Sequence, residues 1–213
     1  MSFTDSNMRK SVFGCILLLA ALLASPGISS ARPVLDFHVE WGYSQCLYQY
    51  HHYNILTSEG SRMQSEEGGF LFHPNGDLLV GVMFKPSTRS GISLLSGYVG
   101  IGESSTAIPF RVRYSFFFKT MYSDGLFCFA ESGIGLKIAT EIEKALAMTD
   151  GIGVGYRLKL TPDISMDTLL SIKCVFDKPR IPNPEGQGFV DKSHILSNTA
   201  SYYAINASIA FFF

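Results

Sequence analysis

Charged residues are scarce in this sequence of 213 residues. Asp, Glu, Lys and Arg make up 16% of the chain, whereas soluble globular domains contain about 25%. The formal net charge is −1 and no block of basic residues stands out, which argues against nucleic acid as a partner. Aromatic residues make up 13% and glycines number 20. This composition indicates that something other than water solvates part of the surface.

Long apolar runs are missing from all but the first part of the chain. Residues 12–24 form an apolar run that follows a basic pair and precedes small residues, the order of a secretory signal peptide. This run is shorter than the about 20 residues of a transmembrane helix, and no later run is long enough, which excludes a helical membrane protein. We predict a signal peptide at 1–31, starting at Met1 or Met8, and one mature domain at 32–213.

Cysteines and other metal ligands are also few. The mature chain keeps Cys46, Cys128 and Cys174, an odd number without the paired spacing of a zinc site or a disulfide framework. One pair among them could still form, since each lies within a strand pattern. His51 and His52 would diverge on an extended chain, and no third ligand is evident. We therefore predict no metal and no cofactor.

A strand pattern recurs eight times in the mature chain. Apolar side chains alternate with small, polar or charged ones, the period of a strand with two different faces. The closing stretch YYAINASIAFFF shows this most clearly. The predicted strands are 35–44, 78–85, 92–103, 108–119, 126–137, 152–161, 170–177 and 202–213.

The connections between these strands sort by length. Strands of about 9–11 residues suit a tilted crossing of a bilayer, and short turns alternate with longer loops except at 104–107. We predict an eight-stranded antiparallel up-and-down transmembrane β-barrel with both termini on the side of the short turns. The alternative is ten strands, if an extra hairpin lies within 49–77. The short turns are 86–91, 120–125 and 162–165, and the long loops are 49–77, 140–151 and 178–200.

Side-chain bulk predicts which face of the wall is inside. Trp41, Phe116 and Phe118 belong to a set too large for the narrow interior of an eight-stranded barrel. A basic residue facing lipid would cost about 2–4 kcal/mol at mid-bilayer, so the glycine-rich and charged set faces inward. Isolated buried charges are costly, and we therefore expect a lumen plugged by paired charges in which basic residues outnumber acidic ones. The predicted lumen cluster is Glu40, Lys85, Arg111, Arg113, Glu131, Arg157, Lys159, Lys173 and Asp177.

Three parts of the sequence resemble the small eight-stranded outer-membrane β-barrel domain proteins of Gram-negative bacteria. They are LLVGVMFKPS, IPFRVRYSFFFK followed by LFCFAESGIGLKI, and the terminal YYAINASIAFFF. The resemblance implies an outer-membrane location, contact with lipid and lipopolysaccharide, and a monomer. It also implies that the last strand is similar to the signal read by the barrel assembly machinery. The residues of that signal are Tyr203, Ile205, Ile209, Phe211 and Phe213.

One motif favours an enzyme. The stretch DKSHILSNTA (191–200) resembles the His-x-Ser-Asn motif of the outer-membrane lipid A 3-O-deacylases. Here His194 and Ser197 are three residues apart, so they point to opposite sides of a strand unless a bulge intervenes, and no carboxylate is placed to orient the histidine. We predict a non-enzymatic structural or surface-binding protein whose loops 49–77 and 178–200 contact an unknown extracellular partner. A lipid A-modifying hydrolase is the alternative.

Overall fold

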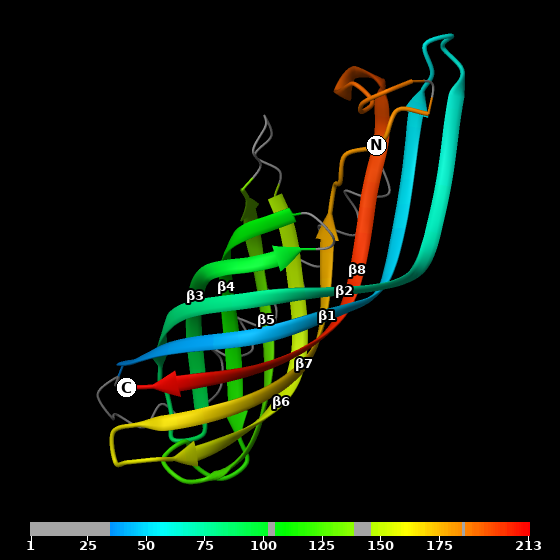
Figure 1. Ribbon diagram of the computed structural model, residues 1–213. Coiled ribbons are helices and arrows are strands. Elements are labelled where there is room, and N and C mark those ends of the chain that lie inside the picture. Colours follow the sequence, from blue (N-terminus) through cyan, green and yellow to red (C-terminus); the bar gives the residue numbers. More distant parts are fainter. Residues whose placement is uncertain (1–34, 102–104, 139–145, 185) are drawn as a thin grey trace.

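The computed structural model describes residues 35–101, 105–138, 146–184 and 186–213. Eight antiparallel strands follow one another around a closed barrel, and β8 returns to pair with β1 (Figure 1). The predicted all-β, eight-stranded, up-and-down barrel is confirmed. The strands are β1 Leu35–Leu56, β2 Arg62–Phe84, β3 Ser90–Ile101, β4 Ser105–Phe117, β5 Gly125–Lys137, β6 Leu146–Lys159, β7 Ser165–Asp177 and β8 Ile195–Phe212.

Some predictions concern residues outside the described ranges. The signal peptide expected at 1–31 lies outside the described residues, as does 140–145 of one predicted loop. A 3₁₀ helix, η1 (Lys192–His194), precedes β8.

Within the described residues, no helix has the length and apolar character needed to cross a membrane.

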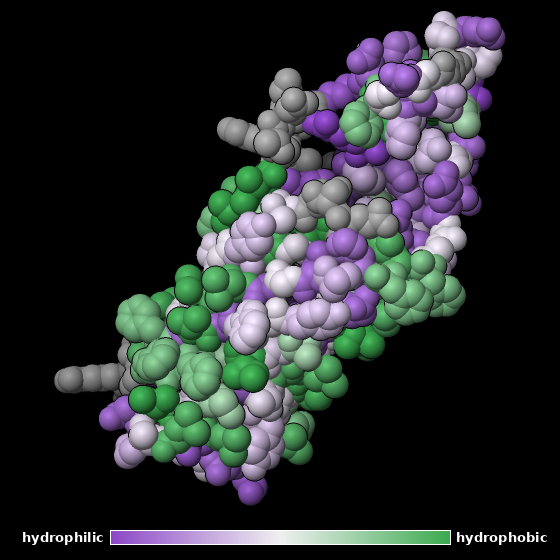
Figure 2. Space-filling model, viewed as in Figure 1, coloured by the Kyte–Doolittle hydropathy of each residue, from purple (hydrophilic) through white to green (hydrophobic). Residues whose placement is uncertain are grey.

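The two faces of the wall carry different side chains. From Ala200 to Phe212, buried and exposed residues alternate along β8, because successive side chains of a strand point to opposite faces. Tyr203, Ile205 and Phe213 are among the exposed ones. Figure 2 shows hydrophobic side chains gathered over the barrel, while the end to which β1, β2 and β8 extend is mostly hydrophilic. This outward apolar band is typical of barrels that cross a membrane.

Three neighbouring strands continue beyond the barrel. β1, β2 and β8 contain 22, 23 and 18 residues, whereas the other strands contain 12 to 14. β2 pairs with β3 only from Asp77 onward, and β7 pairs with β8 only as far as Ala200. Beyond these points β1 still pairs with both neighbours. We call residues 48–56, 62–76 and 195–199 the protruding sheet (Figure 1).

The protruding sheet corrects two expectations. The segment 49–77 is mostly strand, with a turn at 57–61, so the loop predicted there is wrong. It lengthens two existing strands rather than adding new ones, so the ten-strand alternative is wrong as well. Polar and aromatic residues occupy both faces of this hairpin, and an apolar period of two is therefore weak in its sequence.

Two other strands begin earlier than predicted. β6 starts at Leu146 and β7 at Ser165, whereas the sequence predicted starts at 152 and 170. The added residues contain Asp150 and Asp167, which interrupt the apolar alternation of their strands. The charged residue Asp167 is thereby placed inside a strand and faces the lumen.

Candidate functional site

Aromatic side chains pack around one arginine in the lumen near the short turns. The Arg157 guanidinium lies between the rings of Phe117 and Phe212, 4.6 and 4.5 Å from their centroids. Its Nε and Nη2 donate to the two carboxylate oxygens of Asp167, both at 2.7 Å. Nη1 donates to the backbone oxygen of Met121 at 3.3 Å. Arg157 is only 1% exposed, so its charge is compensated within the protein.

A second arginine joins two carboxylates at the centre of the barrel. Arg113 on β4 donates from Nη1 to Glu40 Oε2 on β1 at 2.6 Å. Its Nε and Nη2 donate to Glu131 Oε2 on β5 at 2.9 and 2.7 Å. Ser208 on β8 donates to Glu40 Oε1 at 2.8 Å. The charge-assisted bond from Arg113 to Glu40 crosses the lumen, because β4 and β1 are not neighbours in the wall. Glu131 lies directly opposite Arg113 on the neighbouring strand β5.

The central cluster continues on the side of the lumen away from the short turns. Lys173 Nζ donates to Asp77 Oδ2 at 2.7 Å, and Asn206 Nδ2 donates to the same oxygen at 3.2 Å. Arg111 Nη1 lies 3.9 Å from Asp77 Oδ2 and 3.7 Å from Glu131 Oε1. Polar contacts of that length are commonly bridged by water.

The nine residues of the predicted lumen cluster do not all meet. Glu40, Arg111, Arg113, Glu131 and Lys173 converge at the centre. Arg157 forms its own pair with Asp167. Asp177 pairs with Lys137 at 2.7 Å, and Lys85 pairs with Asp36. Lys159 stays at a turn, where its Nζ donates to the backbone oxygen of Pro162 at 3.4 Å.

Several members of these ion pairs were not included in the prediction. Asp36 and Lys137 lie on the inward phase of predicted strands, so extending the cluster along that phase would have found them. Asp77 and Asp167 precede the predicted strand starts, and only longer strands would have included them. With these residues included, the ion pairs contain as many acidic as basic side chains. The basic members are Lys85, Arg111, Arg113, Lys137, Arg157 and Lys173, and the acidic members are Asp36, Glu40, Asp77, Glu131, Asp167 and Asp177.

The protruding sheet has a packed inner face. Ile55 on β1 and Ile181, in the segment that connects β7 to β8, are each 1% exposed. His51 Nε2 is 2.9 Å from Asn198 Oδ1, and Asn198 Nδ2 donates to the backbone oxygen of Pro179 at 2.5 Å. The connecting segment is therefore fastened to the inner face of the sheet.

The outer face of the protruding sheet carries aromatic and polar side chains. The Tyr48 hydroxyl lies over Gly68, where a Cβ atom would come within 2.5 Å of it. The Tyr48 ring meets the Phe70 ring edge-on at 5.8 Å. Further along, His52 Nδ1 lies 3.2 Å from Glu66 Oε1. Rings and hydrogen-bonding groups thus lie together on an exposed surface.

The two residues of the enzyme-like motif are not hydrogen bonded to each other in the described structure. His194 is exposed in η1, and its Nδ1 lies 3.4 Å from Ser193 Oγ. Ser197 lies in β8 opposite Asn54, so the loop predicted at 178–200 is wrong from Ile195 onward. A bulge does separate them, because the β1–β8 register shifts between Asn54 and Ile55. No ion pair of His194 with a carboxylate is found among the described residues.

Thiols and metal ligands are dispersed. Cys46, Cys128 and Cys174 form no disulfide with one another, so the pairing that the sequence left open does not form. Among the residues that the structure describes, no three His, Cys, Asp or Glu side chains are grouped so that they could hold a metal ion.

Comparisons with known proteins found likenesses among solved structures. No protein-family model matches the sequence, and no curated protein matches it significantly. Outer membrane protein OprG from Pseudomonas aeruginosa aligns with a TM-score of 0.48 and 8% identity, over 86% of this chain and 98% of that one. Neisserial surface protein A gives 0.44 and 9%, over 82% and 95%. The N-terminal β-barrel domain of P. aeruginosa OprF gives 0.42 and 10%, over 85% and 100%.

The fold itself and its surface identify the type of protein. A closed barrel leaves no unpaired strand edge within the wall, which is the condition for a sheet to cross hydrocarbon. The wall exposes large apolar side chains outward and buries charged ones inward, the reverse of a soluble barrel. The chain is a closed eight-stranded β-barrel with the outward apolar band of a barrel that crosses a membrane.

Proposed function

We propose that this protein is a non-enzymatic outer-membrane barrel with a closed lumen, which presents the protruding sheet at the cell surface as a recognition surface. The observation that carries the proposal is the contrast between a lumen crossed by buried ion pairs and a hydrophilic sheet that extends beyond the apolar band. Binding residues are commonly found on segments held by a rigid scaffold. The barrel is such a scaffold.

The ion pairs support a closed lumen. Arg113, Glu40 and Glu131 are each at most 4% exposed, and the hydrogen bonds from Arg113 on β4 to Glu40 on β1 span the interior. The aromatic layer around Arg157 adds a second closure nearer the turns. Planar-bilayer recordings of the purified protein test this. We expect no steady conductance, and a steady large conductance would contradict a closed lumen.

The topology supports the orientation. Both described chain ends and the short turns lie at one end of the barrel, and the protruding sheet lies at the other (Figure 1). Outer-membrane barrels place their short turns in the periplasm and their longer connections outside. The protruding sheet then faces the extracellular medium. Before insertion, the outward residues of the C-terminal strand, Tyr203 to Phe213, are the signal that the assembly machinery reads. The inserted barrel is a monomer in contact with lipid and lipopolysaccharide.

Shortening the protruding sheet tests the recognition role. Tyr50 and Gly68 are directly paired, so residues 51–67 can be replaced by an Asn-Gly turn, which suits a two-residue hairpin. Cells displaying the shortened protein are compared with wild type on arrays of extracellular proteins and glycans. We expect the shortened barrel to lose binding that a variant with a Gly-Ser replacement of 186–188 retains. Unchanged binding after removal of 51–67 would contradict the proposal.

The absence of an enzymatic role has a separate test. Lipid A from expressing and non-expressing cells is compared by mass spectrometry, with Ser197→Ala as the matched variant. We expect identical lipid A in all three samples. Loss of an acyl chain that depends on Ser197 would establish the hydrolase alternative instead.

A further inference from the structure

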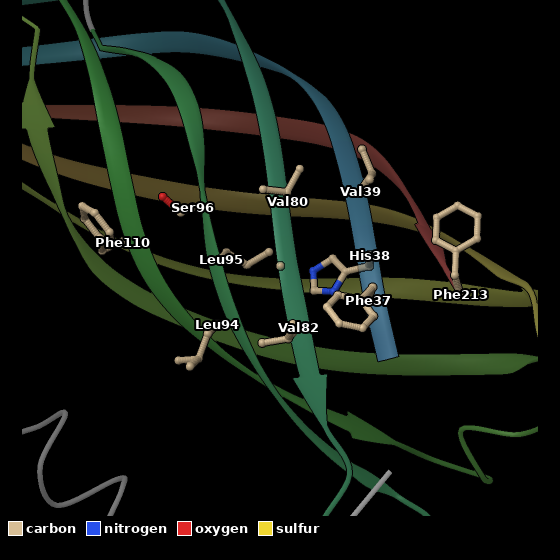
Figure 3. A pocket seen from close by; sticks show the side chains of 11 residues that line it. Phe37, His38, Val39, Val80, Val82, Leu94, Leu95, Ser96, Phe110 and Phe213 are labelled. Atoms are coloured by element: carbon tan, nitrogen blue, oxygen red, sulfur yellow. The ribbon is translucent and has the colours of Figure 1, made fainter. Parts of the chain in front are cut away.

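A depression interrupts the apolar outer wall where β1, β2 and β3 lie side by side (Figure 3). Its volume is about 460 Å³. The short side chains of Val80, Val82 and Ser96 form its floor, and Phe110 and Phe213 stand on opposite sides of it (Figure 3).

Two inward-facing glycines lie on β2 and β3 behind this part of the wall. A Cβ atom on Gly81 would lie 2.4 Å from the backbone oxygen of Leu94, and one on Gly97 would lie 2.1 Å from that of Leu78. β2 and β3 therefore approach each other more closely than a side chain would allow. His38 and Leu95 fill the space behind Gly81, 3.1 and 3.0 Å from the same Cβ position. The depression is thus backed by side chains and open toward the outside.

The depression lies in the lipid-facing part of the wall, near the end that carries the short turns. Phe37 near the start of β1 and Phe213 after the end of β8 both lie at the end of the barrel that carries the short turns. Phe37, Leu94 and Phe213 are 65%, 56% and 57% exposed, as expected of side chains in the lipid-facing band. The depression is continuous with that band, and hydrocarbon is the medium that meets it.

We propose that this depression is a binding site for one acyl chain of a phospholipid in the leaflet nearer the short turns. Lipid tails are as apolar as leucine, so burial from water gives no preference for this place. The preference comes from van der Waals contact, because a chain in a concave site touches atoms on several sides whereas a chain on a flat wall touches them on one. The assignment to the periplasmic leaflet rests on the proposed orientation, but it requires neither the closed lumen nor the recognition surface.

Filling the depression tests the proposal. Val80 and Val154 are 53% and 54% exposed on different parts of the outer wall, so Val80→Phe and Val154→Phe make the same chemical change inside and outside the site. The full barrel is refolded in detergent with phosphatidylglycerol, and retained lipid is counted by native mass spectrometry. We expect wild type and V154F to retain one phospholipid more than V80F. Ser96→Leu, which fills the floor from β3, is expected to match V80F.

A fluorescent reporter makes a second test that does not depend on the filling variants. Trp41 is the single tryptophan of the chain, so Trp41→Phe removes the native tryptophan fluorescence. Two reporters are then introduced one at a time, Leu94→Trp at the edge of the site and Leu170→Trp on β7. Leu94 and Leu170 are 56% and 54% exposed. In mixed micelles with a small fraction of phospholipid brominated along its chains, we expect several-fold stronger quenching of the L94W reporter than of the L170W reporter.

Three results would count against the acyl-chain site. Equal quenching of the two reporters, or equal lipid retention by folded V80F and V154F, would overturn the proposal. Retention of free palmitate in place of phospholipid would overturn the assigned source. Each variant is first shown to be folded by its heat-modifiable migration on a gel. Conductance and surface binding are measured on the same samples, so a failure of the proposed function is recognised separately.

Discussion

The barrel and the protruding sheet share the strands β1, β2 and β8 but expose different kinds of side chain. Within the barrel, β1 turns Glu40 inward and Trp41 outward. Within the protruding sheet, the same strand buries Ile55 and leaves Tyr50 exposed beside the His52 and Glu66 pair. The medium outside differs between the two regions, lipid around one and water around the other. The barrel interior holds apolar clusters as well as charged ones, and the inner face of the protruding sheet buries His51 as well as Ile55.

One extra residue adjusts the strand between these regions. The β1 register shifts between Cys46 and Tyr48 against both neighbours. At this point β1 has one residue more than β8, and β2 has one residue more than β1. Before the bulge, even-numbered residues such as Ser44 are buried, and after it odd-numbered residues such as His51 are buried. A bulge reverses the alternation because two residues of one strand then oppose one residue of its partner. A strand can therefore enter a second environment without ending.

The largest expected effect comes from breaking the central charge cluster. Glu131→Ala leaves Arg113 with one carboxylate instead of two and also removes a negative charge next to Arg111 and Lys173. Removing one partner of a buried pair typically costs about 3–5 kcal/mol. We expect a loss of that size in the free energy of unfolding, measured by urea titration in detergent.

The matched control for Glu131 lies in the protruding sheet. Glu66 pairs with His52 on the outside, and its side chain is 56% exposed. An exposed pair contributes at most about 1 kcal/mol, so Glu66→Ala should change unfolding little. Similar losses for the two variants would show that the barrel interior and the outer face of the sheet do not differ in how they hold charge.

A smaller effect is expected from the close approach of β2 and β3. Gly97 has a φ of 153°, and an added Cβ would meet backbone atoms of Leu78 and Leu79. Gly97→Ala should therefore destabilise the barrel by about 1–3 kcal/mol through backbone strain. Gly69 has open space around its Cβ position, so Gly69→Ala is the control. Equal urea midpoints for the two variants would contradict the steric argument.

The smallest effect is expected within the protruding sheet itself. His51→Ala removes the contact with Asn198, and a hydrogen bond of this kind contributes about 0.5–1.5 kcal/mol. The change should increase amide hydrogen exchange of the segment after β7, which Asn198 holds through Pro179, and leave exchange in the barrel strands unaltered. His52→Ala, which changes the outer face, is the control. Faster exchange throughout the barrel would mean that the two regions unfold together.

The sequence predicted the barrel well where apolar alternation is strong. Strands β4, β5 and β8 follow the predicted period closely, because lipid on one side and a narrow lumen on the other require different side chains at successive positions. The prediction failed where both faces meet water or polar groups. The segment around Gly60, predicted as a loop, is a hairpin, and the start of β7 was missed because Asp167 breaks the apolar pattern.

By itself, the sequence determined the number of strands, the medium around them and which side chains face inward, because alternation is a local property of the chain. The tertiary structure decided which charges meet. Arg113 reaches Glu40 across 73 positions of sequence and Lys173 reaches Asp77 across 96, since such partners depend on the register of every strand between them. The balance of buried charges, the protruding sheet and the hollow above Gly81 depend on the same registers. They follow from closure of the barrel, which no single strand encodes.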